Sequence, residues 1–578
     1  MHQAQGPRNP CFSGRSVENA WHSLYPHHGV IIIRWSLFAS LVVKTEFDYI
    51  IVGAGSAGCV LANRLSASGK HSVLVIEAGG SDKRFWIQTP IGYGKTFYDE
   101  SVNWKYQTES DPGINHRSSY WPRGKVVGGS SSINAMVYIR GQHADFDDWR
   151  DLGNPGWGWQ DVLPYFRKSE TFADGGDEYR GDSGPLYVNN VSRHYHPLCQ
   201  TFFEAAQQHG FKHNPDFNGA DQEGVGYYQI TTRDGRRMSA ARAYLHPALR
   251  RNNCSLVTDA LVTRLRFAGR RANGVDYLQG GRPQNVTARR EVILSAGAIN
   301  SPQLLQLSGI GDATLLKQHG IEVVHDLPGV GRNLQDHLDY CIYYRSRVPT
   351  LNNRLRPWWG KLLAGAQYLL FRNGLLSLSV NQAGGFVRSH PSRPRPNMQM
   401  YFAAMTYTKA PPGERPLMQP DPYPGFLNSI GLTRPQSRGE LGINSADPRD
   451  PVSIRPNYLS VEEDVTQMLE GARLLRQLAS MPALKSIIEH EITPGESVQS
   501  DDEFIADIRQ RADTVYHPSC TCMMGPDPKT AVVDNQCRVY GVDGLRVVDT
   551  SIFPTVTSGN TNGPTIMVAE KAADLIGG

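Results

Sequence analysis

The chain has 578 residues, 57 of them glycine, and 40 % of its residues are hydrophobic, which excludes a wholly disordered chain. Lys and Arg (59) nearly balance Asp and Glu (55), so we expect no concentrated basic face and no nucleic-acid partner. Eight cysteines are too few for a disulfide scaffold and fit a reducing compartment.

Residues 1–45 differ in composition from the rest of the chain. The apolar stretch at 30–43 is interrupted by Arg34 and is shorter than the roughly 20 residues that span a bilayer. A signal peptide would need a basic region directly before it and a small-residue cleavage site after it, and neither is clear. We expect a leader that is disordered or precedes the true start, with a membrane-surface anchor as the alternative.

A glycine-rich turn follows the first predicted strand. Residues 47–52 (FDYIIV) predict the strand, 53–58 (GAGSAG) the turn, and the following helix stops near Gly69. A second strand at 72–76 ends at Glu77. The glycines permit close approach of a pyrophosphate to the helix N-terminus, and the acid can bind a ribose hydroxyl. This unit predicts binding of an ADP moiety and leaves NAD and FAD open.

Two further segments extend this pattern. Residues 123–134 (RGKVVGGSSSIN) combine paired glycines with serines, whose N–H and hydroxyl groups can converge on an anion. Residues 295–311 (SAGAINSPQLLQLSGIG) follow the strand-like 291–294 and predict another strand-to-helix turn at the same sheet.

Together these segments resemble the signatures of the glucose–methanol–choline (GMC) oxidoreductases. Near the C-terminus, residues 516–518 (YHP) and 559–565 (GNTNGPT) resemble the paired active-site segments of that family. The resemblance runs from about residue 47 to 576. Within the family, the residue pattern of these segments is most similar to that of choline dehydrogenases and of quinone-linked aliphatic alcohol dehydrogenases.

The resemblance implies an α/β fold with a Rossmann-like FAD-binding domain of the glucose-oxidase type. An interleaved α+β substrate domain is expected on an antiparallel sheet. We predict that the FAD-binding domain comprises residues 46–166, 224–331 and 513–578, and that the substrate-binding domain comprises 167–223 and 332–512.

The implied reaction is oxidation of a primary alcohol, with an aliphatic one preferred, to the aldehyde. The hydride would go to flavin N5 and the electrons to a quinone-type acceptor. Choline dehydrogenation and an alcohol oxidase that uses O2 remain alternatives, and a lyase, a photodecarboxylase or a non-catalytic flavin protein is less favoured. The oligomeric state stays open.

His517 and Asn560 are the predicted catalytic residues. His517 matches the family's catalytic-histidine segment, and an imidazole has a pKa suited to a general base. At the position of Asn560 relatives carry His or Asn, and an amide can only hydrogen-bond the alcohol oxygen. The alternative for Asn560 is a role in completing a turn.

The resemblance also implies the cofactor site. Some relatives attach FAD covalently through a histidine at position 133, but Ile133 cannot form that bond, so we predict non-covalent FAD. The N-terminal end of the helix after Pro564 would face the flavin pyrimidine. The predicted FAD-binding residues are Gly53, Gly55, Ser56, Ala57, Gly58, Glu77, Ala78, Gly128, Gly129, Ser130, Ser131, Asn134, Ala135, Met136, Val137, Val262, Ala296, Asp549, Thr550, Asn560, Pro564 and Thr565.

Other chemistry is not supported. Cys520 and Cys522 form a CxC motif without a second ligand pair at zinc spacing, so no metal is expected. Asp336 and His337 are interpreted as a structural hydrogen-bonding element. No convincing GxSxG elbow for a serine hydrolase is present.

Residues 356–372 have basic ends, aromatic residues and an apolar middle. The segment predicts a helix that either lies on a membrane surface, which would suit a quinone acceptor, or covers the substrate pocket. We expect a cytoplasmic protein, with contact to the inner face of a membrane as the finer expectation.

Overall fold

The computed structural model describes residues 45–407 and 419–577, so the predicted leader lies outside the described residues apart from its last residue. Strand β1 (Glu46–Val52), helix α1 (Ser56–Ser66) and strand β2 (Val73–Ile76) confirm the predicted strand–turn–helix–strand unit. All four residues of β2 are buried, as expected for a strand covered on both faces.

The first seven-stranded sheet has the order β10-β2-β1-β13-β12-β11, with β24 paired to β13. Its pairs are parallel except for β11–β12 and β12–β13. The remaining strands are β10 (Cys254–Val257), β11 (Ala260–Ala268), β12 (Arg271–Gln279), β13 (Arg282–Leu294) and β24 (Leu545–Val547). The mixed sheet therefore joins the N-terminal strands to a strand near the C-terminus.

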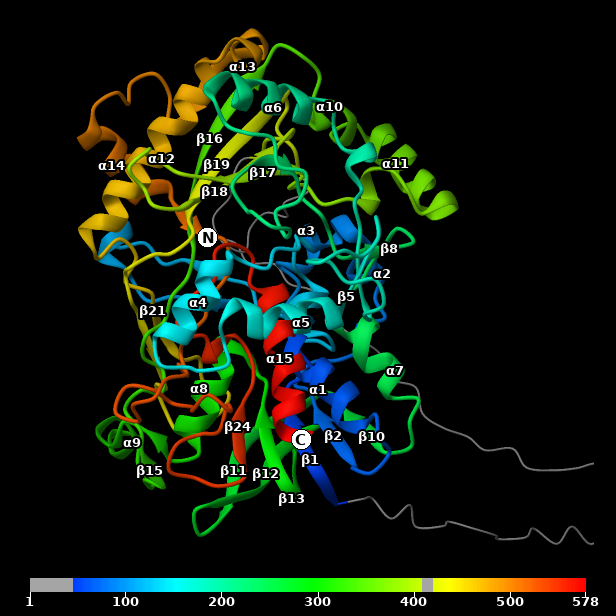
Figure 1. Cartoon of the computed structure of the whole chain (residues 1–578), viewed down its shortest axis with the longest axis vertical. Coiled ribbons are helices and arrows are strands. Elements are labelled where there is room, and N and C mark those ends of the chain that lie inside the picture. The colour runs from blue at the N-terminus through cyan, green and yellow to red at the C-terminus, as the bar shows by residue number, and fades with distance from the viewer. Residues whose placement is uncertain (1–44, 408–418, 578) are drawn as a thin grey trace, which may run out of the picture. The chain divides into compact units, whose positions relative to one another are not determined.

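Helices α1 and α15 (Asn562–Gly577) pack together beside this sheet, and Figure 1 shows the red α15 next to the blue α1. Arg64 of α1 donates two hydrogen bonds to the fully buried Glu570 of α15, at 2.7 and 2.6 Å. Helix α8 (Gly297–Leu307) follows β13, which pairs with β1, and confirms the predicted third strand-to-helix turn.

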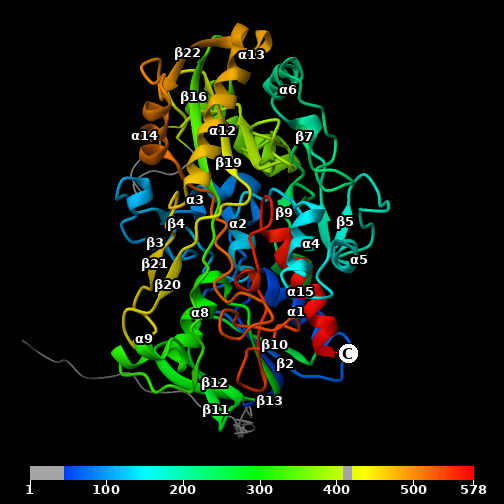
Figure 2. The same cartoon turned by 60° about the vertical axis from the view of Figure 1, so that its left-hand side comes forward.

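The second seven-stranded sheet is antiparallel throughout, with the order β22-β16-β19-β18-β17-β7 and β23 paired to β16. Helix α12 (Glu462–Ser480) packs on β19 and β16, as Figure 2 shows. The strands of this second sheet are β7 (Gly224–Tyr227), β16 (Leu338–Ser346), β17 (Ala383–Val387), β18 (Met398–Ala403), β19 (Gly425–Leu432), β22 (Ile488–Thr493) and β23 (Asp513–Thr514).

Two sheets of these kinds confirm the predicted fold class. The domain boundaries remain a prediction. Strand β7 opens the predicted segment 224–331 yet pairs with β17 of the second sheet. Strands β20 (Glu440–Gly442) and β21 (Ser453–Arg455) pair with each other in a separate two-stranded sheet.

Helix α11 (Trp358–Phe371) confirms the predicted helix within residues 356–372. In the described ranges, no helix combines the length and the apolar character needed to cross a bilayer.

Candidate active site

A cavity of about 1120 Å³ brings together the β1–α1 turn, the loop at 122–137 and strands β16, β18 and β19. Most of the residues predicted to bind FAD line this cavity, together with His517 and Asn560. Segments far apart in the sequence thus form one continuous site.

The β1–α1 turn depends on glycine. Gly53 has φ +99°, and a Cβ atom there would lie 2.5 Å from the Ser295 carbonyl oxygen. A Cβ on Gly58 would lie 1.9 Å from the Gly53 carbonyl oxygen. No side chain caps the N-terminus of α1, so its first N–H groups can bind an anion such as a pyrophosphate.

Glu77 ends β2 at the cavity wall. Its Oε2 accepts a hydrogen bond from the Ala54 N–H and its Oε1 one from the Gly79 N–H, both at 2.8 Å. Burial raises the pKa of Glu77 to about 7. A buried carboxylate held at the end of the second strand is placed to accept from ribose hydroxyls.

The second glycine-rich loop packs against the first. Gly128 and Gly129 have φ +90° and +52°, and a Cβ on Gly129 would lie 2.7 Å from the Gly55 Cα atom. The turn η3 (Gly129–Ser132) follows, and Ser130 and Asn134 line the cavity. The two backbones can approach this closely because position 129 is glycine.

Arg237 holds Asn134 in place, a role that the sequence did not reveal. Its Nη1 donates to Asn134 Oδ1 at 2.7 Å, and the Asn134 side chain also accepts from the Met136 N–H. Burial lowers the pKa of Arg237 to about 9. This buried cation therefore fixes the start of the segment 134–137, which lines the cavity.

Asp549 links the C-terminal segment to helix α8. Its carboxylate accepts from the Gly297 N–H at 2.8 Å and the Ser301 hydroxyl at 2.6 Å. The Ser56 hydroxyl donates to Asn562 Oδ1 at 2.8 Å, which ties α1 to the first residue of α15. Both links hold the C-terminal segment of the chain against the helices beside the cavity.

His517 is held in one tautomer by His337. His337 Nε2 lies 2.9 Å from the Thr433 carbonyl oxygen, which only accepts, so this nitrogen carries a proton. Burial lowers the pKa of His337 to about 4, so its Nδ1 is an acceptor. His517 Nδ1, 2.9 Å away, must therefore donate to it.

The other ring nitrogen of His517 consequently carries a lone pair. Asn560 Nδ2 lies 3.1 Å from His517 Nε2 and donates to it. Burial also lowers the pKa of His517 well below its ordinary value, helped by the nearby Arg123. The neutral imidazole thus presents an unprotonated nitrogen at the cavity, which is the state that a general base requires.

The amide of Asn560 is oriented from the second sheet. Its Oδ1 accepts from Gln399 Nε2 at 3.2 Å and from the Tyr401 hydroxyl at 3.4 Å, both on β18. The Asn560 NH2 group is therefore directed to His517 and the cavity. The Asp336 carboxylate accepts from the backbone N–H of His517 at 2.7 Å, a hydrogen bond that holds the chain at this residue.

Four residues predicted to bind FAD do not line the cavity. Gly58 packs against the Gly53 carbonyl oxygen, and the Gly128 N–H donates to the Ala54 carbonyl oxygen at 2.7 Å. The Ser131 hydroxyl donates to the Gly128 carbonyl and accepts from the Ala240 N–H. Pro564 is buried within α15. These four residues shape the loops that carry the lining residues.

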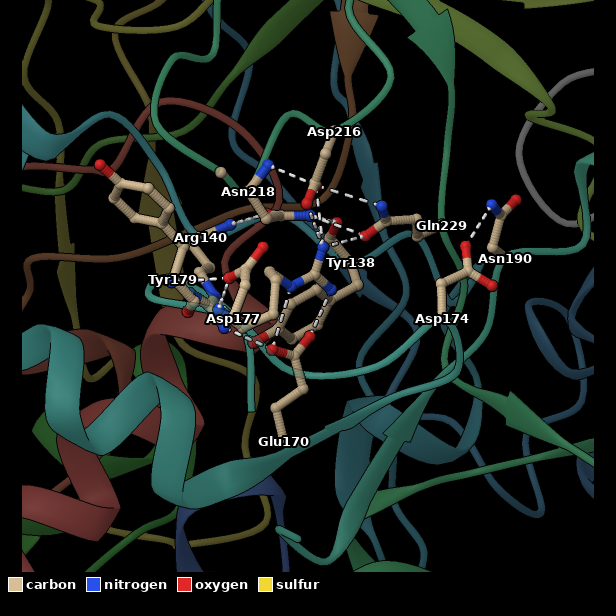
Figure 3. Close-up of polar contacts among 12 residues, drawn as sticks. Tyr138, Arg140, Glu170, Asp174, Asp177, Tyr179, Asn190, Asp216, Asn218 and Gln229 are labelled. Carbon is tan, nitrogen blue, oxygen red and sulfur yellow. Dashed lines mark hydrogen bonds and ion pairs between the residues drawn. The ribbon is translucent and has the colours of Figure 1, made fainter. Parts of the chain in front are cut away.

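A buried ion network supports the segment that leaves the cavity at residue 137 (Figure 3). Glu170 accepts from Arg140 and Arg180, and all three side chains are almost fully buried. Arg180 also pairs with Asp216 at 2.7 Å. Asn218 Nδ2 donates to the Tyr138 carbonyl oxygen at 3.1 Å. The network thereby fixes the backbone directly after Val137.

Comparisons with known proteins identify the family of the chain. The GMC oxidoreductase N-terminal model matches residues 47–339, and the C-terminal model matches 435–569. The chain is 45 % identical to the oxygen-dependent choline dehydrogenase of Photobacterium profundum, over 92 % of this chain and 93 % of that protein. It is 46 % identical to the alcohol dehydrogenase (acceptor) of Pseudomonas putida, over 92 % and 95 % respectively.

Among solved structures, an FAD-dependent oxidoreductase from Chaetomium thermophilum is similar, with a TM-score of 0.82 and 30 % identity. The similarity covers 92 % of this chain and 99 % of that one. The chain therefore belongs to the GMC oxidoreductase family and is an FAD-dependent enzyme that oxidises alcohols.

Proposed function

We propose that this enzyme oxidises a primary alcohol, preferentially an aliphatic one, to the aldehyde and passes the electrons to a quinone-type acceptor. The observation that carries the proposal is the His517–Asn560 pair at the wall of a cavity that also contains both glycine-rich loops.

His517 takes the hydroxyl proton of the substrate. Its Nε2 holds the lone pair, and the imidazolium formed keeps its Nδ1–H bonded to His337. A general base of this kind contributes roughly 10²- to 10⁴-fold in rate. In the structure the Nε2 lone pair accepts from Asn560 Nδ2, so the substrate hydroxyl must displace that hydrogen bond. The Asn560 NH2 group then donates to the substrate oxygen, where negative charge develops as the proton leaves.

FAD, when bound, accepts the hydride from the alcohol carbon. The Gly53–Gly58 turn, Ser130, Asn134 and the N-terminal end of α15 would hold it. At position 133 the chain has isoleucine, which is 2 % exposed and cannot attach a flavin. We therefore propose non-covalent FAD, so acid denaturation should leave all flavin in the supernatant.

The rest of the cavity lining bears on the substrate. Val380, Met405 and Leu427 favour an alkyl chain. The same lining includes Tyr343, Tyr401, Tyr407, Tyr423, Asp339 and Asp421. Tyrosines with carboxylates can also bind a quaternary ammonium, so choline is the second candidate substrate.

Anaerobic flavin reduction separates these candidates. The holoenzyme is mixed with 1-octanol, benzyl alcohol or choline, and the flavin absorbance is followed. We expect 1-octanol to reduce the flavin with a higher second-order rate constant than choline does. The reverse order would favour choline as the substrate. In a separate assay under air, peroxide formed in step with alcohol consumed would indicate an oxidase. His517→Ala should lower the reduction rate at least about 100-fold, and near-native rates would contradict the mechanism.

A further inference from the structure

Helix α11 exposes large apolar side chains along almost its whole length, and it lies at the right-hand edge of Figure 1. The exposed fractions run from 53 % for Trp359 to 76 % for Trp358. The apolar face of α11 comprises Trp358, Trp359, Leu362, Leu363, Leu369, Leu370 and Phe371. A cluster of this size marks an interaction surface, because isolated exposed hydrophobic residues are the norm elsewhere.

The helix is attached to the protein by one narrow stripe. Its buried residues are Gly360, Ala364 and Tyr368, spaced four apart. Ala364 and Tyr368 pack with Ile91 and Leu376. The remaining circumference of α11, Lys361 included, faces outward.

Cations frame the apolar face of α11, and the helix itself contains no acidic residue. The hairpin of β8 (Thr232–Arg233) and β9 (Arg236–Arg237) lies against the C-terminal end of α11. Its Gly235 is so close that an added Cβ would lie 1.8 Å from the Arg372 carbonyl oxygen. The exposed basic residues on or beside the helix are Arg233, Arg236, Arg354, Arg356 and Lys361, with Arg372 half-buried. The same hairpin exposes one acidic residue, Asp234, 3.9 Å from Arg233, so the surroundings keep an excess of positive charge. Tryptophans and leucines flanked by Lys and Arg are typical of a helix that lies on an anionic lipid surface.

The buried stripe of α11 lies close to the active-site cavity. None of the fourteen residues of α11 lines the cavity, so the helix does not itself cover the substrate. Val380 lines the cavity and packs on the cluster beneath α11. The Val380 N–H donates to the hydroxyl of Tyr93, another lining residue, at 3.2 Å. One layer of side chains therefore separates the cavity from the helix.

We propose that α11 binds the surface of an anionic lipid bilayer, with its Trp and Leu side chains among the lipid headgroups. The cavity is thereby held next to the bilayer in which a quinone dissolves. The role of the bilayer as the source of the electron acceptor rests on the proposed quinone acceptor, whereas lipid binding by α11 does not.

Vesicle flotation of the purified full-length holoenzyme tests the proposal. The vesicles are phosphatidylcholine alone or phosphatidylcholine with phosphatidylglycerol. The test variant is Leu363→Glu/Leu370→Glu. The matched control is Leu152→Glu, because Leu152 is 52 % exposed and lies outside the apolar face of α11. Activity is measured with a water-soluble dye and with ubiquinone in vesicles.

We expect the wild type and L152E to float with the phosphatidylglycerol vesicles, and L363E/L370E to bind about tenfold or more weakly. Dye-linked activity should stay unchanged in all three proteins, while the double variant loses ubiquinone-linked activity. Equal flotation of L152E and L363E/L370E, or no flotation of the wild type, would overturn the proposal. A wild-type dimer that the double variant abolishes, without vesicle binding, would assign the face to a second copy instead. If the wild type shows no dye-linked activity, that result would count against the proposed function and not against lipid binding.

Discussion

Replacing His337 tests whether the histidine pair sets the tautomer of the base. His337→Ala removes the acceptor for the Nδ1–H of His517 while leaving Asn560 and the cavity lining intact. The buried Nδ1–H then has no acceptor, which favours the tautomer that carries its proton on Nε2. In that tautomer the nitrogen facing the cavity cannot accept the substrate proton.

The size of the effect follows from the buried hydrogen bond. Leaving a buried donor without a partner costs about 1–3 kcal/mol, and each 1.4 kcal/mol is about tenfold in rate. We therefore expect H337A to reduce its flavin about 10- to 100-fold more slowly than the wild type. His337→Asn keeps a side-chain oxygen near the Nδ1 position and should recover most of that loss.

Anaerobic stopped-flow measurement of flavin reduction gives both the limiting rate and the substrate dependence. A positioning role lowers the limiting rate and leaves the apparent substrate affinity nearly unchanged. A merely structural role would instead lower flavin content and thermal stability, and H337N would not rescue the rate. An H337A rate within twofold of the wild type at equal flavin content would refute the reasoning.

Three further predictions follow from the described contacts. Because burial holds the pKa of His517 well below 6.5, the rate of flavin reduction should stay level as pH falls to 6.5 and decline only at lower pH; a decline centred above pH 7 would contradict this. Gly53→Ala should abolish FAD retention because its Cβ would lie 2.5 Å from the Ser295 oxygen, whereas Gly69→Ala, also at positive φ but in open space, should keep its flavin in an absorbance assay. Glu170→Gln should destabilise the fold by about 3–5 kcal/mol in urea unfolding, because it leaves the buried Arg140 without an anion and Arg180 with Asp216 alone; an unchanged midpoint would show that the network contributes little.

The glycine-rich turns could be predicted from sequence because their signals are local. The strand, the turn and the helix of residues 47–66 lie within twenty positions, and a Cβ at Gly53 or Gly58 would meet the carbonyl oxygen of Ser295 or Gly53. The fold class followed from three such segments and the family they resemble.

The partners of the catalytic residues could not be predicted, because they come from distant parts of the chain. His337 and His517 are 180 positions apart, and Gln399 lies 161 positions from Asn560. Residue types alone do not show which of 18 histidines meet. Helix α11 is apolar on most of its circumference, so its sequence did not indicate which stripe would be buried.

The link between α1 and α15 has a consequence for biosynthesis. The Ser56–Asn562 and Arg64–Glu570 contacts each join residues 506 positions apart, and β24 completes the first sheet only at residues 545–547. A nascent chain therefore cannot make these contacts until residues 545–570 have left the ribosome. Closure of the site therefore comes late in synthesis, and a chain that lacks residues 570–577 would lose Glu570 and with it the clamp on the first helix.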